Sequence, residues 1–343
     1  MSPNNFAAVL PVAQGTITVG PVDYPTLPPG GVILRNTVAA FNPVDWKIAR
    51  NGNRPIQYPA VLGYSYGGVV EAVDEAVSRV KKGDHAFTHN PKAGGFQRFS
   101  AADAKFVGKV DDKSVEEAAA VVLNLRTIIG AAVEAGLDRP KDTKTANSSN
   151  GKKALVYGGS SSLGALAIQY LVQAGYTVIS TSSPANHALV SGFRAAVVVD
   201  HTQSADDVVG ALKQHGPYDF AFDAISTPPA TAINAAVLGA QTGDIVLYSV
   251  GPPPADVDIP KNVARVNKAW PASLAVSDPS FDEWVFVKYI PEAVAAGTLK
   301  SVPLELIHGG LGAVDEGLRK LEKGVSAQKL ILYQWEDAPK SEL

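Results

Sequence analysis

The residues best suited to chemistry lie in one short segment, where an apolar run ends in a turn of glycines and serines. Ala154–Tyr157 is followed by Gly158-Gly159-Ser160-Ser161-Ser162, and an apolar helical pattern starts at Leu163. A strand, a tight turn and a helix in this order predict a pyrophosphate site, because the helix N-terminus offers unpaired N–H groups. The turn departs from G-x-G-x-x-G, but its hydroxyls suit phosphate oxygens. They favour a phosphate site over an ordinary strand-to-helix turn without a ligand.

Composition limits the function classes that the chain can belong to. The 343 residues suggest two domains, and 46% hydrophobic and 18% charged residues are typical of a globular enzyme. The net charge of −3 and the lack of a long basic run argue against nucleic acid as a partner. The absence of cysteine excludes disulfides and thiolate metal sites. No secretory signal is visible, and the apolar stretch 118–137 is interrupted by charges, so we expect a cytoplasmic protein with no membrane partner.

The order of predicted elements indicates the fold. The first 110 residues contain short apolar runs separated by Gly and Pro, which indicate a β-rich domain. A long helix with a capping-box start follows Ser114, and residues 138–153 form a polar loop. Strands then alternate with helices, which predicts an α/β fold with a Rossmann doubly wound parallel sheet. The pattern places strands at 195–200, 218–224 and 244–250, helices at 205–215 and 281–296, and a last strand that ends at Tyr333.

Four motifs together resemble the medium-chain dehydrogenase/reductase superfamily. They are Leu34–Lys47, Val61–Val70, Val80–Asp84 and Gly324–Leu332, so the resemblance extends along nearly the whole chain. The resemblance implies a GroES-like catalytic domain in residues 1–125 and 287–343, and a Rossmann NADPH-binding domain in residues 126–286. The segment Asn42-Pro-Val-Asp-Trp-Lys47 is similar to fungal trans-acting enoyl reductases that serve polyketide synthases.

The same resemblance points to the zinc-free branch of quinone oxidoreductases and enoyl reductases. The zinc branch has a Cys near Asn42 and a His-Glu pair after Gly63, where this chain has Tyr64 and Ser65. The lobe that holds the structural zinc is absent as well. The six histidines show no helical metal pair, so we expect no metal.

The cofactor choice is argued from the segment after the second Rossmann strand. An NAD site usually places a carboxylate there, but the segment from Ser180 to His187 contains none, which favours NADPH. The segment also lacks Arg and Lys, which would bind a 2′-phosphate strongly. The alternative to a phosphate site is an ordinary serine-rich turn beside a surface histidine. The resemblance implies that Ser183, Asn186 and the adenosine contact His201 line this site. With the turn, the expected cofactor-binding set is Val44, Asp45, Trp46, Lys47, Ser160, Ser161, Ser162, Leu163, Ser183, Asn186, His201, Ser249, Val250, Gln328 and Lys329.

Without a metal, a hydrogen-bond donor must stabilise the oxygen that gains charge during hydride transfer. Lys47, Thr127 and Tyr64 are the candidate catalytic residues, together with backbone N–H groups near Ser249–Gly251. Each has a structural alternative. Lys47 can hold a carboxylate such as Asp45, Thr127 can bond back to its own helix, and Tyr64 can serve packing.

These observations predict an NADPH-dependent reductase that acts on an activated carbon–carbon double bond, either an enone or an enoyl thioester. An NADPH quinone oxidoreductase and a non-catalytic NADPH-binding protein are the alternatives. The expected partner is a small apolar alkene, free or bound to a carrier protein. We expect its pocket in the cleft between the domains. The candidate wall residues are Tyr64, Trp270, Phe281 and Trp284. The chain is expected to be a monomer or a homodimer.

Overall fold

Two units of the chain, each with its own core, make up the computed structural model, which describes residues 3–52, 56–137, 139–145 and 148–338. Unit 1 comprises Met1–Leu123, Glu283–Ala295 and Pro303–Leu343. Unit 2 comprises Asn124–Asp282 and Ala296–Val302. The chain therefore passes from the first unit to the second inside one helix. It returns to unit 1 at Glu283, belongs to unit 2 again from Ala296 to Val302, and ends in unit 1.

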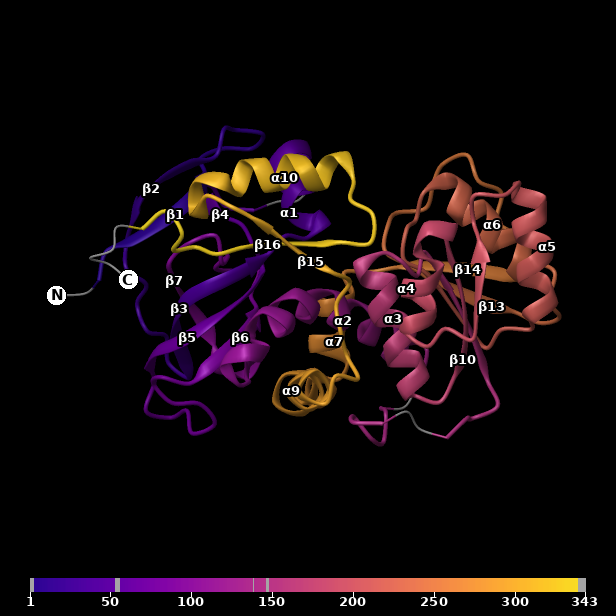
Figure 1. Ribbon diagram of the computed structural model, residues 1–343, viewed down its shortest axis with the longest axis horizontal. Helices are drawn as coiled ribbons and strands as arrows, with labels where there is room; N and C mark the ends of the chain where they lie inside the picture. Colours follow the sequence, from indigo (N-terminus) through magenta and orange to yellow (C-terminus); the bar gives the residue numbers. More distant parts are fainter. Residues whose placement is uncertain (1–2, 53–55, 138, 146–147, 339–343) are drawn as a thin grey trace. The chain divides into compact units, whose positions relative to one another are not determined.

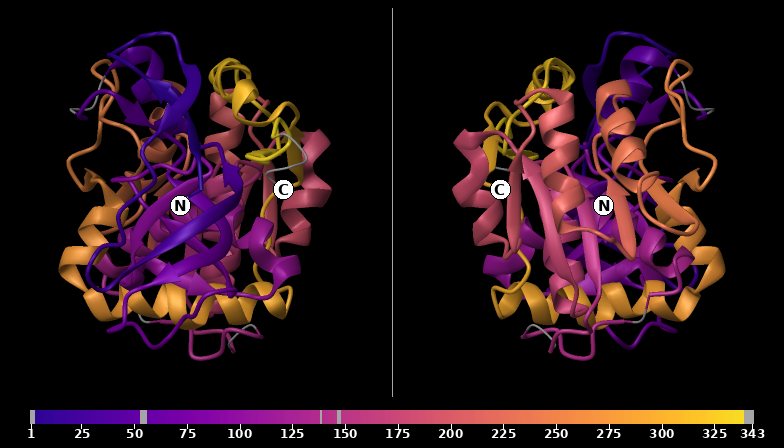
Figure 2. Two further views of the ribbon diagram at one scale, coloured as in Figure 1. Left: turned by 90° about the vertical axis from the view of Figure 1, so that its left-hand side faces the viewer. Right: turned by 90° about the vertical axis from the view of Figure 1, so that its right-hand side faces the viewer.

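Unit 1 is β-rich, as the Gly- and Pro-punctuated runs predict. β3 is the longest strand and pairs with β5, β7 and β16, all antiparallel. Its apolar residues are buried almost without interruption, which fits a central strand covered on both faces. The larger sheet has seven strands in the order β15-β16-β3-β5-β6-β8, with β7 also on β3, and the smaller is β2-β1-β4. The left-hand view of Figure 2 shows β1 and β2 side by side. The strands are β1 (Asn5–Leu10), β2 (Thr18–Val22), β3 (Gly31–Ala40), β4 (Ala60–Val61), β5 (Ser65–Val73), β6 (His85–His89), β7 (Phe99–Asp103), β8 (Val107–Lys109), β15 (Leu304–Ile307) and β16 (Lys329–Leu332).

Two helices of unit 1 pack against each other beside the larger sheet. α1 (Pro43–Asn51) has Pro at its first position and ends at Gly52, whose φ of 59° is the left-handed conformation that glycine adopts at a helix C-terminus. α10 (Val314–Lys323) has acidic residues in its first turn and lysines in its last, which suits the helix dipole. The Phe41 N–H, just before α1, donates to the Leu330 carbonyl on β16 (3.0 Å), so α1 starts beside that strand (Figure 1). Three short 3-10 turns also belong to this unit: η1 (Ala104–Phe106), η2 (Asp112–Ser114) and η5 (Gly310–Ala313).

Unit 2 contains a six-stranded parallel sheet in the order β11-β10-β9-β12-β13-β14. This is the 3-2-1-4-5-6 order of the Rossmann fold, so the predicted fold class is confirmed. The right-hand view of Figure 2 shows helices on both sides of this sheet. The elements are β9 (Lys153–Tyr157), α3 (Ser162–Gln173), β10 (Thr177–Ser182), η3 (Pro184–Asn186), α4 (His187–Gly192), β11 (Val197–Asp200), α5 (Ala205–His215), β12 (Phe220–Asp223), α6 (Pro228–Leu238), β13 (Ile245–Ser249), β14 (Val263–Asn267) and α7 (Trp270–Ser277).

The helical segments at the unit boundaries differ in detail from the pattern. α2 (Val115–Glu134) starts directly after the η2 turn that ends at Ser114. The helix expected over 281–296 consists of α8 (Pro279–Trp284), a π-helical turn (η4, Val285–Tyr289) and α9 (Ile290–Ala295). A period of 3.6 residues does not reveal the extra residue of a π turn. None of the helices in the described part of the chain combines the length and apolar character that a membrane crossing requires.

Candidate functional site

The glycine and serine turn adopts the geometry of a phosphate cradle. Gly158 has a φ of +88°, and the Ser161 hydroxyl donates to its carbonyl (2.8 Å) while accepting from the Gly164 N–H (3.0 Å). Ser161 is thus the N-cap of α3. The N–H groups of Ser162 and Leu163, at the first two helical positions, have no acceptor within the helix. They remain for an anion, and the three serines are half-buried beside them.

Gly164 allows the helix to approach the turn closely. A Cβ at this position would lie 2.1 Å from the Gly158 carbonyl oxygen, which is backbone and cannot move aside alone. The second residue after the serines, Gly164, is therefore a glycine for steric reasons. Close packing of helix on strand is the function of the last glycine in dinucleotide-binding turns.

Two polar residues that the sequence pattern did not single out hold this turn from outside. Thr181 Oγ1, on β10, accepts from the Gly158 N–H (2.9 Å). Asn124 Nδ2, on α2, donates to Ser162 Oγ (2.9 Å). Asn124 could have been found from the sequence, because it interrupts an apolar helical stretch. A polar side chain that is buried there needs a hydrogen-bond partner.

The residues expected at the adenosine ribose gather at the end of β10. Asn186 Nδ2 donates to Ser183 Oγ (3.3 Å), and both side chains are half-buried. His201 is exposed, with its ring 6.4 Å from that of Tyr157. A hydroxyl and an amide are therefore close together at this strand end, and His201 lies beside Tyr157. Their role toward a 2′-phosphate stays a prediction.

The backbone N–H groups proposed as oxyanion donors already have an acceptor. The N–H groups of Val250 and Gly251 both donate to Ser226 Oγ, at 3.2 and 3.1 Å. Ser226 adopts a positive φ of 60°, and its own N–H donates to the buried carboxylate of Asp223 (2.8 Å). Ser249, also expected here, is buried, and its hydroxyl donates to the Val266 carbonyl (3.0 Å). The loops after β12 and β13 are thus tied together at the carboxyl end of the sheet.

In unit 1, the segment that resembles the family signature contains a buried charge network. The Asp45 carboxylate accepts from the backbone N–H groups of Asn42 (2.8 Å) and Gly63 (3.0 Å) and is fully buried. Lys329 Nζ, at the start of β16, donates to Asn42 Oδ1 (2.6 Å). Burial raises the pKa of Asp45 to about 6 despite these bonds and the charge of Lys329. Burial likewise lowers the pKa of Lys329 to about 8, against the opposing effect of Asp45.

The structure therefore places the expected cofactor contacts of unit 1 in two environments. Asp45 and Lys329 are inside the core. Val44 and Trp46 are half-buried, whereas Lys47 and Gln328 are exposed. The partner of the Asp45 charge is Lys329, because Lys47 projects from another side of α1, with its ammonium 5.8 Å from the Trp46 ring.

The aromatic candidates are mostly in the two cores. Tyr64 is 6% exposed, and Phe281 is 3% exposed. Trp270 is fully buried and donates from Nε1 to the Ser249 carbonyl (2.8 Å), so it supports the strand end rather than an open wall. Trp284 stacks on Tyr289 within unit 1.

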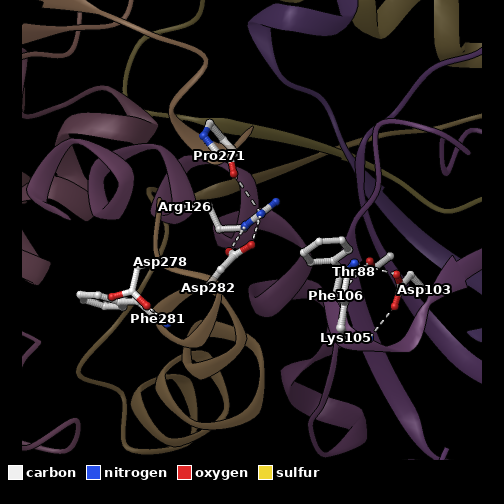
Figure 3. A network of polar contacts seen from close by, with 9 residues as sticks. All are labelled: Thr88, Asp103, Lys105, Phe106, Arg126, Pro271, Asp278, Phe281 and Asp282. Carbon is white, nitrogen blue, oxygen red and sulfur yellow. Dashed lines mark hydrogen bonds and ion pairs between the residues drawn. The ribbon is translucent and has the colours of Figure 1, made fainter. Parts of the chain in front are cut away.

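Thr127 lies on α2 and directly follows Arg126, which forms a buried ion pair in unit 2. Its neighbour Arg126 makes a two-pronged contact with Asp282, from Nε to Oδ1 (2.7 Å) and from Nη2 to Oδ2 (2.6 Å), and also donates to the Pro271 carbonyl (3.2 Å). Figure 3 shows the guanidinium and the carboxylate facing each other. Both side chains are buried, and Thr127 is buried next to them. This pair fixes the orientation of the α2 turn that carries Thr127.

Among the described residues, no group of three or more His, Asp or Glu side chains is arranged to hold a metal ion. The positions that the zinc branch fills with ligands are occupied by Asn42 and Tyr64, and the Asn42 amide oxygen accepts from a lysine.

Comparison with known proteins agrees with this geometry. Residues 28–112 match the model of the alcohol dehydrogenase GroES-like domain. The chain is 32% identical to a trans-enoyl reductase, himH, of Aspergillus japonicus, over 96% of this chain and 97% of the relative. It is 31% identical to the dehydrogenase orsE of Emericella nidulans, over 96% and 99%.

Solved structures with the same fold include an alcohol dehydrogenase superfamily protein from Novosphingobium aromaticivorans, with a TM-score of 0.76 at 18% identity, covering 96% of this chain and 99% of that one. The quinone oxidoreductase of Coxiella burnetii aligns with a TM-score of 0.70 at 19% identity, covering 96% and 99%. The relatives indicate an oxidoreductase, and the fold implies a nicotinamide cofactor. The chain belongs to the medium-chain dehydrogenase/reductase superfamily, in its fungal enoyl reductase branch.

The close approach at Gly164 gives a direct test of the turn. We expect Gly164→Ala to lower the free energy of unfolding by about 1–3 kcal/mol, because the new methyl group displaces α3 from the Gly158 carbonyl. Gly210→Ala is the matched control. Gly210 is exposed in α5 with nothing within 4 Å of an added Cβ, so the change should stabilise by about 0.5–1 kcal/mol. Urea unfolding of both variants measures the two values, and equal effects would contradict the steric account.

Proposed function

We propose that this protein is an NADPH-dependent enoyl reductase that saturates the conjugated double bond of an enone or enoyl thioester. The observation that carries the proposal is the similarity to a trans-enoyl reductase along nearly the whole of both chains. The glycine and serine turn supports it, because its free helix N–H groups and hydroxyls suit a pyrophosphate. We further propose that the acyl chain is presented free or on a carrier protein, and that the protein acts as a monomer or a homodimer.

When bound, NADPH supplies a hydride to the β-carbon of the alkene, the electron pair moves onto the carbonyl oxygen, and a proton then adds to the α-carbon. The chain must bind the cofactor, stabilise the oxygen and exclude competing water reactions. The turn at Gly158–Gly164 would hold the pyrophosphate. Lys47 is the exposed cation of the family-like segment and is proposed to contact the cofactor ribose or the substrate.

The preference for NADPH over NADH is proposed from the groups at the end of β10. Ser183 and Asn186 offer a hydroxyl and an amide, and the strand end carries no carboxylate of its own. We expect Ser183→Asp to reduce NADPH affinity by at least about tenfold while NADH affinity rises or stays, because the new carboxylate repels a 2′-phosphate and accepts from a 2′-hydroxyl.

Fluorescence titration of both dinucleotides against wild type and Ser183→Asp measures this change. Ser191→Asp, which adds the same charge at an exposed position in α4, is the control. Unchanged relative affinities in the Ser183 variant would contradict the assignment.

The reaction itself is tested by following the hydride. Incubation of the protein with a crotonyl thioester and NADPH that carries deuterium at both C4 positions should give the saturated thioester with one deuterium at the β-carbon. Mass spectrometry of the product reads this directly. A saturated product without deuterium, or no product with any enone or enoyl thioester, would exclude the proposed reaction.

A further inference from the structure

A carboxylate lies beside the proposed 2′-phosphate site, although none occurs in the segment that normally decides cofactor choice. Asp200 is the last residue of β11, and in the parallel register it pairs with Ser182, the last residue of β10. Adjacent residues of paired parallel strands lie about 5 Å apart. Asp200 therefore ends its strand next to the Ser183 and Asn186 turn.

Two histidines connect the strand ends. The His201 backbone N–H donates to the Ser182 carbonyl (3.3 Å), and His187 Nε2 lies 3.3 Å from the same oxygen. Ser182, His187 and His201 thus meet at one carbonyl, and Asp200 directly precedes one of the histidines in the chain. A phosphate at this turn would therefore have the His187 imidazole beside it and the Asp200 carboxylate close by.

The Asp200 carboxylate is fixed in place and charged. Its Oδ1 accepts from the Thr202 N–H (2.8 Å) and the Thr202 hydroxyl (2.7 Å). These bonds, followed by the nearby charges of His187 and His201, lower the pKa of Asp200 from its usual value.

We propose that Asp200 is a specificity-determining residue, which limits the preference for NADPH by holding a negative charge beside the site of the 2′-phosphate. The inference rests on the proposed function, because it assigns the end of β10 to the adenosine ribose. A 2′-phosphate carries up to two negative charges and is repelled by Asp200, whereas the 2′-hydroxyl of NADH is not. Asp200 therefore weakens NADPH binding selectively.

The test is Asp200→Asn, which removes the charge but keeps an oxygen to accept from Thr202. Titration with NADPH and with NADH at low ionic strength should show NADPH bound about three- to tenfold more tightly, with NADH affinity changed less than about twofold. The NADPH gain should shrink in 0.5 M salt, which screens exposed charges. Asp200→Glu, which retains the charge, should bind NADPH like wild type.

Asp206→Asn is the matched control, because it removes the same charge from the exposed first turn of α5. It should leave both affinities within about twofold of wild type. If it strengthens NADPH binding as much as Asp200→Asn does, the effect is one of net charge and the proposal fails. An equal gain for both dinucleotides, or a loss of NADH binding alone, overturns it as well.

Failure of the proposed function would look different. It is read from wild type alone, which would bind neither dinucleotide or would bind NADPH without reducing an enoyl thioester. Failure of the inference alone leaves an active, NADPH-binding wild type whose affinities Asp200→Asn does not alter. If Asp200→Asn does not fold, Asp200→Ser keeps a hydroxyl acceptor for the Thr202 N–H and tests the same charge. The ratio of NADPH affinity to NADH affinity, compared between this variant and wild type, decides the outcome.

Discussion

Replacing Lys329 with Met is expected to lower the free energy of unfolding by about 3–5 kcal/mol at pH 8, the usual cost of leaving a buried charge without its partner. Lys329 is 3% exposed, and Asp45 is fully buried. Met fills a similar volume, so the loss reports the missing charge and the missing bond to Asn42 rather than a cavity. Urea unfolding at pH 8 measures the change.

The pH dependence distinguishes this account from a simple packing defect. The pKa of Asp45 is raised to about 6 in the folded protein, so its contribution to stability is complete below pH 4 and is lost as pH rises through about 6. The pKa of Lys329 is lowered to about 8, so its contribution grows as pH rises from about 8 to 10.5. Together the two groups give their smallest contribution between pH 6 and 8, where both are charged.

In Lys329→Met, the Asp45 pKa should rise further, because the neighbouring positive charge is gone. The variant is therefore expected to lose little at pH 5, where the carboxyl is neutral, and most at pH 8. Lys82→Met is the control, because Lys82 forms a surface pair with Glu71 (2.8 Å) and is 72% exposed. It should cost less than about 1 kcal/mol at either pH. The same loss for Lys329→Met at pH 5 and pH 8 would contradict the charge account.

Arg126→Met is expected to destabilise unit 2 by a similar amount, about 3–5 kcal/mol, because it leaves the Asp282 carboxylate buried without its guanidinium. The two-pronged geometry and the further bond to the Pro271 carbonyl make this contact specific for arginine. Arg126→Lys should therefore recover only part of the loss. Denaturant unfolding followed by tryptophan fluorescence measures it, since Trp270 is buried in the same unit.

The matched control for Arg126 is Arg319→Met. Arg319 pairs with Asp315 four residues earlier on α10 (2.6 Å), but its side chain is 65% exposed. Water and salt screen this pair, so its removal should cost less than about 1 kcal/mol. If the two arginine variants lose equal stability, burial does not determine the value of the Arg126 contact.

Local patterns predicted the elements around the dinucleotide turn well. The α5 helix follows Ser204, an N-cap whose hydroxyl accepts from the Asp207 N–H, and its bounds agree with the expected 205–215. α3 begins at Ser162, one residue before the expected start, because Ser161 is the cap. Caps and apolar spacing are written in neighbouring residues, so the sequence shows them directly. The π turn at Val285–Tyr289 has no such local sign.

The site was less predictable because its partners are far apart in the chain. Lys329 and Asn42 are separated by 287 positions, and no spacing rule links them. The resemblance implies that Asp45 and Lys329 contact the cofactor. Inside unit 1, the Asp45 carboxylate accepts from two backbone N–H groups, and the Lys329 ammonium donates to the Asn42 side chain. Asp200 was missed for a related reason. The usual rule examines the end of the second Rossmann strand, and this carboxylate arrives from the third.

NADPH oxidation by the purified protein, compared in one experiment with an enoyl thioester and with a simple quinone, separates the proposed reductase from its alternatives. We expect faster oxidation with the thioester, accompanied by formation of the saturated acyl chain. Faster oxidation with the quinone would instead identify a quinone oxidoreductase. Tight NADPH binding with no oxidation by either acceptor would contradict the proposed enzyme and indicate a non-catalytic NADPH-binding protein.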